Sequence, residues 1–268
     1  MIMIKFPRNI NFNSANKLLK KNKIKINYND LVDKNNADFI FRKKPVPIFL
    51  EQFFLLYKLI TLNKRTTILE FGSGYSTLAF KIAMSENKKK YSHFFLQKKM
   101  RRNNCFEVHV MENLKIYREN TKRLIKYKIN KNYNEAKVVF YKWEPQMTLF
   151  NSYICTEYKK IPLVNPDFIY LDGPSQFSVR NRVNNFTTAH KDIPPVGCDI
   201  LKIEHFLLPG TIIAIDGRVA NVRFLKNNFK RNWSYKEHKL TDMHLFYLNE
   251  PPLGIWNKRL MDFYKTDL

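Results

Sequence analysis

One stretch of the sequence decides the fold, and it reads Ile68-Leu69-Glu70-Phe71-Gly72-Ser73-Gly74-Tyr75-Ser76-Thr77. Residues 66–70 predict a short buried strand, whereas residues 76–85 have the apolar spacing of a helix. Gly72 and Gly74 lie between them, and glycine lets a backbone turn sharply and approach a ligand closely because it has no Cβ. A glycine turn between a strand and a helix is typical of a cofactor-binding loop.

Two details of this turn argue against a nicotinamide or flavin cofactor. The third glycine of the dinucleotide fingerprint is absent, and Thr77 stands in its place. The carboxylate of Glu70 would repel a pyrophosphate, but it suits the ammonium group of an amino-acid moiety. The turn therefore favours a cofactor with an amino-acid part.

The rest of the chain alternates predicted strands with predicted helices, which implies an α/β fold with a mostly parallel sheet. We expect further strands at residues 106–111, 137–143, 167–172, 211–215, 233–239 and 243–249. We expect further helices at residues 46–61, 114–128, 198–207 and 218–229. Ligands bind such sheets beyond the carboxyl ends of the strands, where Glu70, Glu112, Asp172 and Asp216 are expected.

With these residues the sequence resembles the class I, Rossmann-like S-adenosylmethionine-dependent methyltransferases. Residues 68–77 are similar to that family's motif I, residues 167–173 to its motif IV, and residues 208–216 to the loop and strand that follow. The likeness covers about 65–250. It implies a three-layer fold whose seven-stranded sheet is mostly parallel, with an antiparallel late strand.

The resemblance also assigns cofactor contacts. It implies that Glu70 and the Gly72–Gly74 backbone, with Ser73 between the glycines, hold the methionine part of S-adenosylmethionine. Ser76 and Thr77 would cap the following helix and reach the cofactor's carboxylate, and Glu112 would bind the ribose hydroxyls. On this view Gly72→Val abolishes cofactor binding with the fold intact, because a Cβ would occupy the ligand's space.

Methyl transfer is an in-line displacement in which the protein aligns the acceptor and removes its proton. Asp172 and Asp216 end the fourth and fifth strands, and His190 lies in the connection between them, so these three are the candidate catalytic groups. Arg180 and Arg218 are candidates to hold an anionic acceptor. The alternatives are that Asp172 only stabilises its turn and that His190 is an exposed loop residue.

A metal ion is a further option that we do not favour. Catechol-type O-methyltransferases place an aspartate after strand four and an Asp-Asn pair after strand five, and Asp172 and Asp216 resemble the two aspartates. Gly217 stands where that pair has asparagine, although Asn221 follows one helical turn later. We therefore assign no metal ligands.

The chain is long enough for one large domain, which we place at residues 46–250. We expect residues 1–45 to be an irregular basic arm and residues 251–268 a C-terminal tail. The basic segment 87–104 reads as an insertion that explains the wide spacing of Gly74 and Glu112. Residues 144–165 are either an acceptor-binding lid or an aromatic cover for the sheet, and the adenine contact is expected at their start, near Trp143 and Glu144.

The formal charge of +24 invites a nucleic-acid partner, but abundant lysine, asparagine and isoleucine also characterise AT-rich genomes. The leading hypothesis is therefore an O-methyltransferase for a small-molecule or sugar-type acceptor. A second is an RNA methyltransferase with residues 88–102 as its docking segment, although the Asn/Asp-Pro-Pro-aromatic motif of base-amine methylation is replaced by Asp172-Gly173-Pro174-Ser175. A third is a non-catalytic module that binds a nucleotide or a partner.

We expect a cytoplasmic protein with no membrane span. No secretory signal is visible at the start, and the apolar stretch at residues 46–62 is interrupted by polar residues. The three cysteines are odd in number and widely spaced, which fits neither a disulfide framework nor a zinc site. The oligomeric state is left open.

Overall fold

The computed structural model describes residues 4–21, 23–24, 50–96, 100–128 and 135–265. Seven strands form one sheet in the order β3-β2-β1-β6-β7-β9-β8, and a two-stranded hairpin stands apart from it. The sheet strands are β1 (Thr67–Phe71), β2 (Glu107–Met111), β3 (Lys137–Tyr141), β6 (Phe168–Leu171), β7 (Ile212–Asp216), β8 (Trp233–His238) and β9 (Met243–Leu248). Only β9 runs antiparallel to its two neighbours; the other adjacent pairs are parallel. The predicted sheet with an antiparallel late strand is confirmed.

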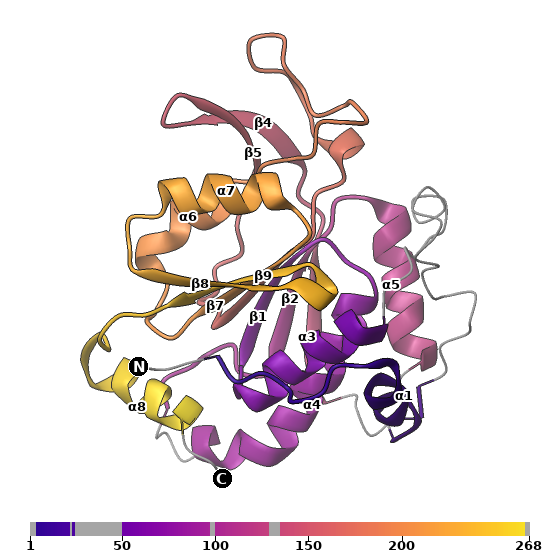
Figure 1. Cartoon of the computed structure of the whole chain (residues 1–268), viewed down its shortest axis with the longest axis vertical. Helices are drawn as coiled ribbons and strands as arrows, with labels where there is room; N and C mark the ends of the chain where they lie inside the picture. The colour runs from indigo at the N-terminus through magenta and orange to yellow at the C-terminus, as the bar shows by residue number, and fades with distance from the viewer. Residues whose placement is uncertain (1–3, 22, 25–49, 97–99, 129–134, 266–268) are drawn as a thin grey trace.

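Helices cover both faces of this sheet (Figure 1). They are α1 (Phe12–Lys21), α3 (Leu50–Leu62), α4 (Tyr75–Leu96), α5 (Lys115–Lys128), α6 (Asp199–Ile203), α7 (Val219–Asn228) and α8 (Gly254–Lys265). One core joins α1, α3 and α4 to one face of the sheet, and a second joins α6 and α7 to the other face. Short 3₁₀ helices lie between these elements at Gln176–Ser178, Glu204–Phe206 and Lys239–Thr241.

The inner strands β1, β6, β7 and β9 are buried on both faces because their sequences are mostly apolar, as strands between two helix layers require. Every residue of β1 is buried, and so is every residue of β9. Within each strand, alternate side chains enter opposite cores: Ile68 joins the α3–α4 core and Leu69 joins the α6–α7 core. The structure therefore has the three layers expected from the sequence.

Two expectations about the terminal segments are corrected. Residues 12–21 of the supposed irregular arm form α1, whose Ala15, Leu18 and Leu19 are buried, and residues 25–45 lie outside the described part. Residues 254–265 of the supposed tail form α8, which packs with Tyr91 and Phe106.

Two segments inside the domain have secondary structure that the sequence did not predict. Residues 87–96 of the expected insertion continue α4, and buried Asn87 of that helix donates hydrogen bonds to the carbonyl oxygens of Ile60 and Arg65. That residues 87–104 are an insertion stays a prediction. Residues 144–165 contain a hairpin that periodicity did not reveal, formed by β4 (Pro145–Phe150) and β5 (Tyr153–Tyr158).

No helix in the described ranges is long and apolar enough to cross a membrane.

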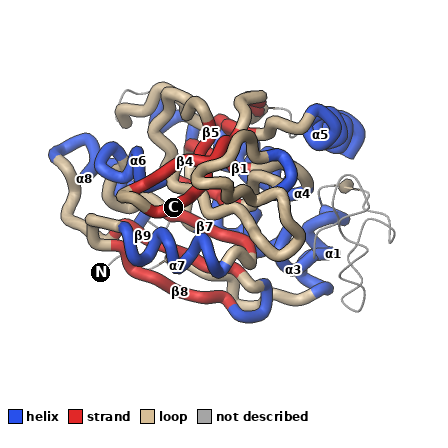
Figure 2. The backbone as a smooth tube through the Cα atoms, turned by 90° about the horizontal axis from the view of Figure 1, so that it is seen from above, coloured by secondary structure: helices blue, strands red, loops and turns tan. Residues whose placement is uncertain are grey.

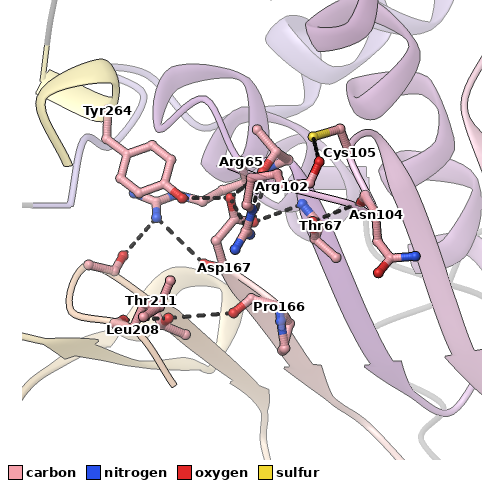
Figure 3. Close-up of polar contacts among 12 residues, drawn as sticks. Arg65, Thr67, Arg102, Asn104, Cys105, Pro166, Asp167, Leu208, Thr211 and Tyr264 are labelled. Atoms are coloured by element: carbon pink, nitrogen blue, oxygen red, sulfur yellow. Dashed lines mark hydrogen bonds and ion pairs between the residues drawn. The ribbon is translucent and has the colours of Figure 1, made fainter. Parts of the chain in front are cut away.

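Asp167 holds together the edge of the sheet where its parallel strands begin (Figure 3). Its buried carboxylate accepts hydrogen bonds from the backbone N–H groups of Thr66 and Thr67 at 2.9–3.0 Å. It also accepts one from the Tyr264 hydroxyl of α8 at 2.7 Å and forms an ion pair with Arg102 at 3.1 Å. The carboxylate thus joins β1, β6, the Arg102 segment and α8, and it explains why the C-terminal residues are helical and docked.

Replacing Asp167 with asparagine removes the counter-charge of Arg102, whose side chain is 5% exposed. Since an unpaired buried charge is costly, we expect Asp167→Asn to lower the free energy of unfolding by about 3–5 kcal/mol. Tyr264→Phe removes one hydrogen bond to the carboxylate and should cost about 1.5–3 kcal/mol. Urea denaturation measures both, and an Asp167→Asn variant as stable as wild type contradicts the assignment.

Candidate cofactor and acceptor site

Glu70, the fourth residue of β1, lies beneath the turn and is fully buried. Its carboxylate accepts a hydrogen bond from the Ser76 hydroxyl and another from the Thr77 hydroxyl at 2.7 Å. The Thr77 oxygen in turn accepts a hydrogen bond from the Gly74 backbone N–H at 3.2 Å. Buried Glu70 thus anchors the first turn of α4 through hydrogen bonds.

Burial raises the pKa of Glu70 from 4.5 to about 8, and the hydrogen bonds from Ser76 and Thr77 only partly oppose it. Both carboxylate oxygens are engaged by protein hydroxyls. Direct contact between Glu70 and an ammonium group, as the resemblance implied, thus stays a prediction; the geometry itself favours a supporting role.

The two glycines of the turn have different surroundings. Gly72 has a φ of +102°, and a Cβ there would lie 3.1 Å from the Asp172 carbonyl oxygen. A Cβ on Gly74 would meet no protein atom within 4 Å. The reason given for the effect of Gly72→Val is therefore wrong. The added Cβ would strain the backbone and contact the turn after β6, so it would not occupy the space of a ligand. Gly74 is the position that faces open space.

Glu112 follows β2 and is tied to the same turn. Its carboxylate accepts hydrogen bonds from the Ser73 hydroxyl at 3.1 Å and from the Leu114 backbone N–H at 2.9 Å. Ser73 also accepts a hydrogen bond from the Thr121 hydroxyl of α5 at 3.2 Å. Burial raises the pKa of Glu112 to about 7. The structure thus brings together Ser73 and Glu112, while ribose binding by Glu112 stays a prediction.

Asp172 follows β6, the neighbour of β1 on its other side, and its side chain is 45% exposed. Arg218 holds this turn: its guanidinium donates to the carbonyl oxygens of Asp172 at 2.7 Å and Pro174 at 3.3 Å. It also lies 3.5 Å from the Asp172 carboxylate. Arg218 is therefore occupied by protein groups, and binding of an anionic acceptor would have to displace them.

Asp216 is the last residue of β7, and its carboxylate accepts a hydrogen bond from Gln52 of α3. Burial raises the pKa of Asp216 to about 8; the nearby Asp172 carboxylate raises it further, while Arg218 and the Gln52 hydrogen bond lower it. The role of Gln52 was not predicted from the sequence. Gln52 is one of several polar residues in a mostly apolar helix, and it precedes its partner by 164 positions, so nothing local marked it.

His190 is in a different setting from the two aspartates. Its side chain is 59% exposed, and its Nδ1 accepts a hydrogen bond from the Asp192 backbone N–H at 3.1 Å. Among the described residues, no hydrogen bond or ion pair joins it to Asp172 or Asp216. The structure brings Asp172 and Asp216 to one edge and leaves His190 in its own loop, so a catalytic role for His190 stays a prediction.

Asn221, which lies near the position of a possible third metal ligand, forms hydrogen bonds within the protein. The Asn221 amide exchanges two hydrogen bonds with the backbone of Gly197, at 2.9 and 3.2 Å. Within the described ranges, no three His, Cys, Asp or Glu side chains form a group that could hold a metal ion.

The β4–β5 hairpin and the loop 172–197 leave the sheet at the carboxyl ends of β3 and β6. In Figure 1 they rise together beyond one end of the sheet, and Figure 2 views them from above. Backbone hydrogen bonds join them, between Met147 and Arg180 at 3.0 Å and between Arg180 and Pro145 at 2.9 Å. The Arg180 guanidinium forms an ion pair with Glu144 at 2.9 Å, so this side chain also links the loop to the start of the hairpin. Trp143 stacks on Tyr141 at the end of β3, and adenine contact there stays a prediction.

The buried carboxyl of Glu70 predicts a pH dependence of stability. Its folded-state pKa of about 8 exceeds the ordinary 4.5. Between these two pKa values the folded protein therefore binds more protons than the unfolded chain, and the free energy of unfolding falls as the pH rises through this range. Glutamine cannot ionise, so the free energy of unfolding of Glu70→Gln should fall less than that of wild type between about pH 5 and about pH 8. Urea denaturation at several pH values measures the slopes; the exposed control Glu237→Gln should keep the wild-type slope, and an equal slope for Glu70→Gln contradicts the prediction.

No family model and no curated protein matches the chain. Solved structures that are similar to it include the methyltransferase PaMTH1 of Podospora anserina bound to S-adenosylhomocysteine, with 14% identity, 91% of this chain and 99% of that chain covered, and a TM-score of 0.44. Another is the O-methyltransferase TomG from Streptomyces achromogenes, involved in tomaymycin synthesis, in complex with S-adenosylmethionine, with 12% identity, coverages of 88% and 96%, and a TM-score of 0.41. A third is the O-methyltransferase from Bacillus cereus with S-adenosylhomocysteine, with 14% identity, coverages of 91% and 92%, and a TM-score of 0.35.

These likenesses are distant, so the assignment of the fold depends on the chain's own strand order. The order β3-β2-β1-β6-β7-β9-β8, the antiparallel β9 and the glycine turn after β1 give the described chain a three-layer, Rossmann-like fold with the antiparallel late strand that the resemblance implied.

Proposed function

We propose that this protein is an S-adenosylmethionine-dependent methyltransferase that acts on a hydroxyl group of a small-molecule or sugar-type acceptor. The observation that supports it most is the open side of the Gly74 turn, beside Ser73 and Glu112 and next to the end of β6. This is the edge of a parallel sheet at which ligands bind, and the strand order reverses between β1 and β6.

The turn fits a cofactor that carries an amino acid. The N-terminus of a helix favours a carboxylate, and Glu70, Ser76 and Thr77 keep the N-terminus of α4 in one position. Glu112 lies beside Ser73, one strand away, where its carboxylate suits ribose hydroxyls. When bound, S-adenosylmethionine supplies an electrophilic methyl group on a sulfonium.

Asp216 is the proposed general base and Asp172 its neighbour at the acceptor. S-adenosylmethionine would donate its methyl group to the acceptor oxygen and leave as S-adenosylhomocysteine, and the Asp216 carboxylate would take the proton of the acceptor hydroxyl. Gln52 holds that carboxylate in one orientation through its hydrogen bond. A pKa of about 8 suits a base that works near neutral pH.

An RNA acceptor is less well supported. The proposed site carries Glu112, Asp172 and Asp216, and such a set of carboxylates disfavours a polyanion close to the reacting centre. In the basic segment 88–102, Arg102 is buried in its ion pair with Asp167 and is not available to phosphates. If RNA is nevertheless the acceptor, affinity should fall steeply with salt, whereas activity on a small acceptor should not.

The three cysteines are free thiols, which fits the reducing, cytoplasmic setting expected from the sequence.

A non-catalytic binding module is the remaining alternative function. Calorimetry with S-adenosylmethionine and S-adenosylhomocysteine distinguishes this module from the enzyme. If neither ligand binds, the enzyme proposal fails.

Gly74→Val tests the cofactor site, because the new side chain would project into open space and occupy the ligand's position. We expect S-adenosylhomocysteine binding to be lost in calorimetry, with the circular dichroism spectrum and melting temperature close to wild type. Gly197→Ala is the matched control, since its Cβ would make ordinary contacts of 3.6 Å or more away from the turn. Full affinity in Gly74→Val would place the cofactor elsewhere.

Asp216→Asn tests the proposed base. We expect the rate of S-adenosylhomocysteine formation with an active acceptor to fall by about 10²–10⁴-fold, while affinity for S-adenosylhomocysteine stays unchanged. The rate of the wild-type enzyme should rise with pH and level off near the Asp216 pKa of about 8, because the deprotonated form accepts the proton. A variant that retains the wild-type rate shows that Asp216 is not the base.

A further inference from the structure

A cavity away from the proposed site lies between α4, α5 and β3. Its volume is about 490 Å³, within the range of small-ligand pockets. Three lysines line it, Lys81 of α4, Lys122 of α5 and Lys137 of β3. Apolar side chains form the rest of its wall, chiefly Ile125 and Phe140.

Lys81 is the unusual member of this set. It is 6% exposed, and its ammonium donates a hydrogen bond to the Ala136 carbonyl oxygen at 2.9 Å. An ammonium has three donors, and no carboxylate of a described residue forms an ion pair with this one. Desolvation lowers the pKa of Lys81. A buried cation without a counter-charge is costly, and an anionic ligand is one way to supply that charge.

The charges around the cavity leave it positive. Its one acidic lining residue, Glu135, lies 3.8 Å from Lys89, and its carbonyl oxygen accepts a hydrogen bond from Lys88. These two lysines belong to the basic run that the sequence analysis considered for RNA binding. Lys122 has a carboxylate partner at 2.9 Å, and an exposed pair of this kind is weak and can rearrange toward a ligand. The ammonium of Lys137 lies 3.4 Å from the Glu107 carboxylate, and the Lys137 side chain is itself exposed.

We propose that this cavity binds the phosphate group of a small organic phosphate. The Lys81 ammonium provides the fixed charge, because lysine binds phosphate as a point charge. Lys122 and Lys137 add positive charge at the wall, and Ile125 and Phe140 contact the carbon part of the ligand. The residues that line the cavity belong to α4, α5 and the segment 135–140, and none of them is a residue of the proposed cofactor site.

Lys81→Met tests the proposal, with phenyl phosphate and inorganic phosphate as the two probes. In phosphate-free buffer we expect the variant to melt at or above the wild-type temperature, because it removes a desolvated charge. Calorimetry should show phenyl phosphate binding to the wild type and an affinity lower by at least about tenfold in the variant, since a hydrogen bond to a charged group is lost. Lys160→Met, at an exposed position, is the control for net charge and should bind like the wild type.

The two probes distinguish the sources of the phosphate. Stronger binding of phenyl phosphate than of inorganic phosphate supports use of the apolar wall, and equal binding overturns the organic part of the proposal. Equal losses of affinity in Lys81→Met and Lys160→Met, or absence of phenyl phosphate binding to the wild type at millimolar concentration, overturn the site itself. None of these outcomes depends on methyl transfer.

Discussion

The close approach of two backbone turns, after β1 and after β6, is the constraint on which the proposed site depends. A Cβ on Gly173 would lie 2.7 Å from the Gly72 nitrogen, and a Cβ on Gly72 would lie 3.1 Å from the Asp172 carbonyl oxygen. Neither turn can therefore carry a side chain at this contact. Because these glycines let the strand ends meet, the Gly74 side of the first turn stays open and Asp172 lies beside it.

Buried hydrogen bonds then hold each part of the edge in place. Glu70 fixes the start of α4 through Ser76 and Thr77, and Arg218 fixes the turn after β6 through two carbonyl oxygens. Such groups are preorganised by the fold, so a ligand need not order them on binding. The carboxylates at this edge also have raised pKa values, which desolvation and their mutual repulsion explain.

The charge of the protein is unevenly distributed with respect to function. The formal charge is +24, yet Glu112, Asp172 and Asp216 gather at the edge where the cofactor is proposed to bind. Arg102, which belongs to one of the basic runs, is buried in a structural ion pair with Asp167. Net charge is therefore a poor guide to this protein's ligands, and the local arrangement of charges is more informative.

The sequence by itself determined the layer architecture, the positions of the seven strands of the main sheet and the glycine turn, because these depend on local periodicity and on the absence of a Cβ at particular positions. Only the tertiary structure decided which side chains are available. It buried Glu70, assigned Arg180 and Arg218 to protein partners and brought Gln52 to Asp216 across 164 positions. It also made helices of residues 12–21 and 254–265, whose stability comes from the surfaces they cover. Contacts between distant segments depend on packing geometry, which the periodicity of residues along the chain does not predict.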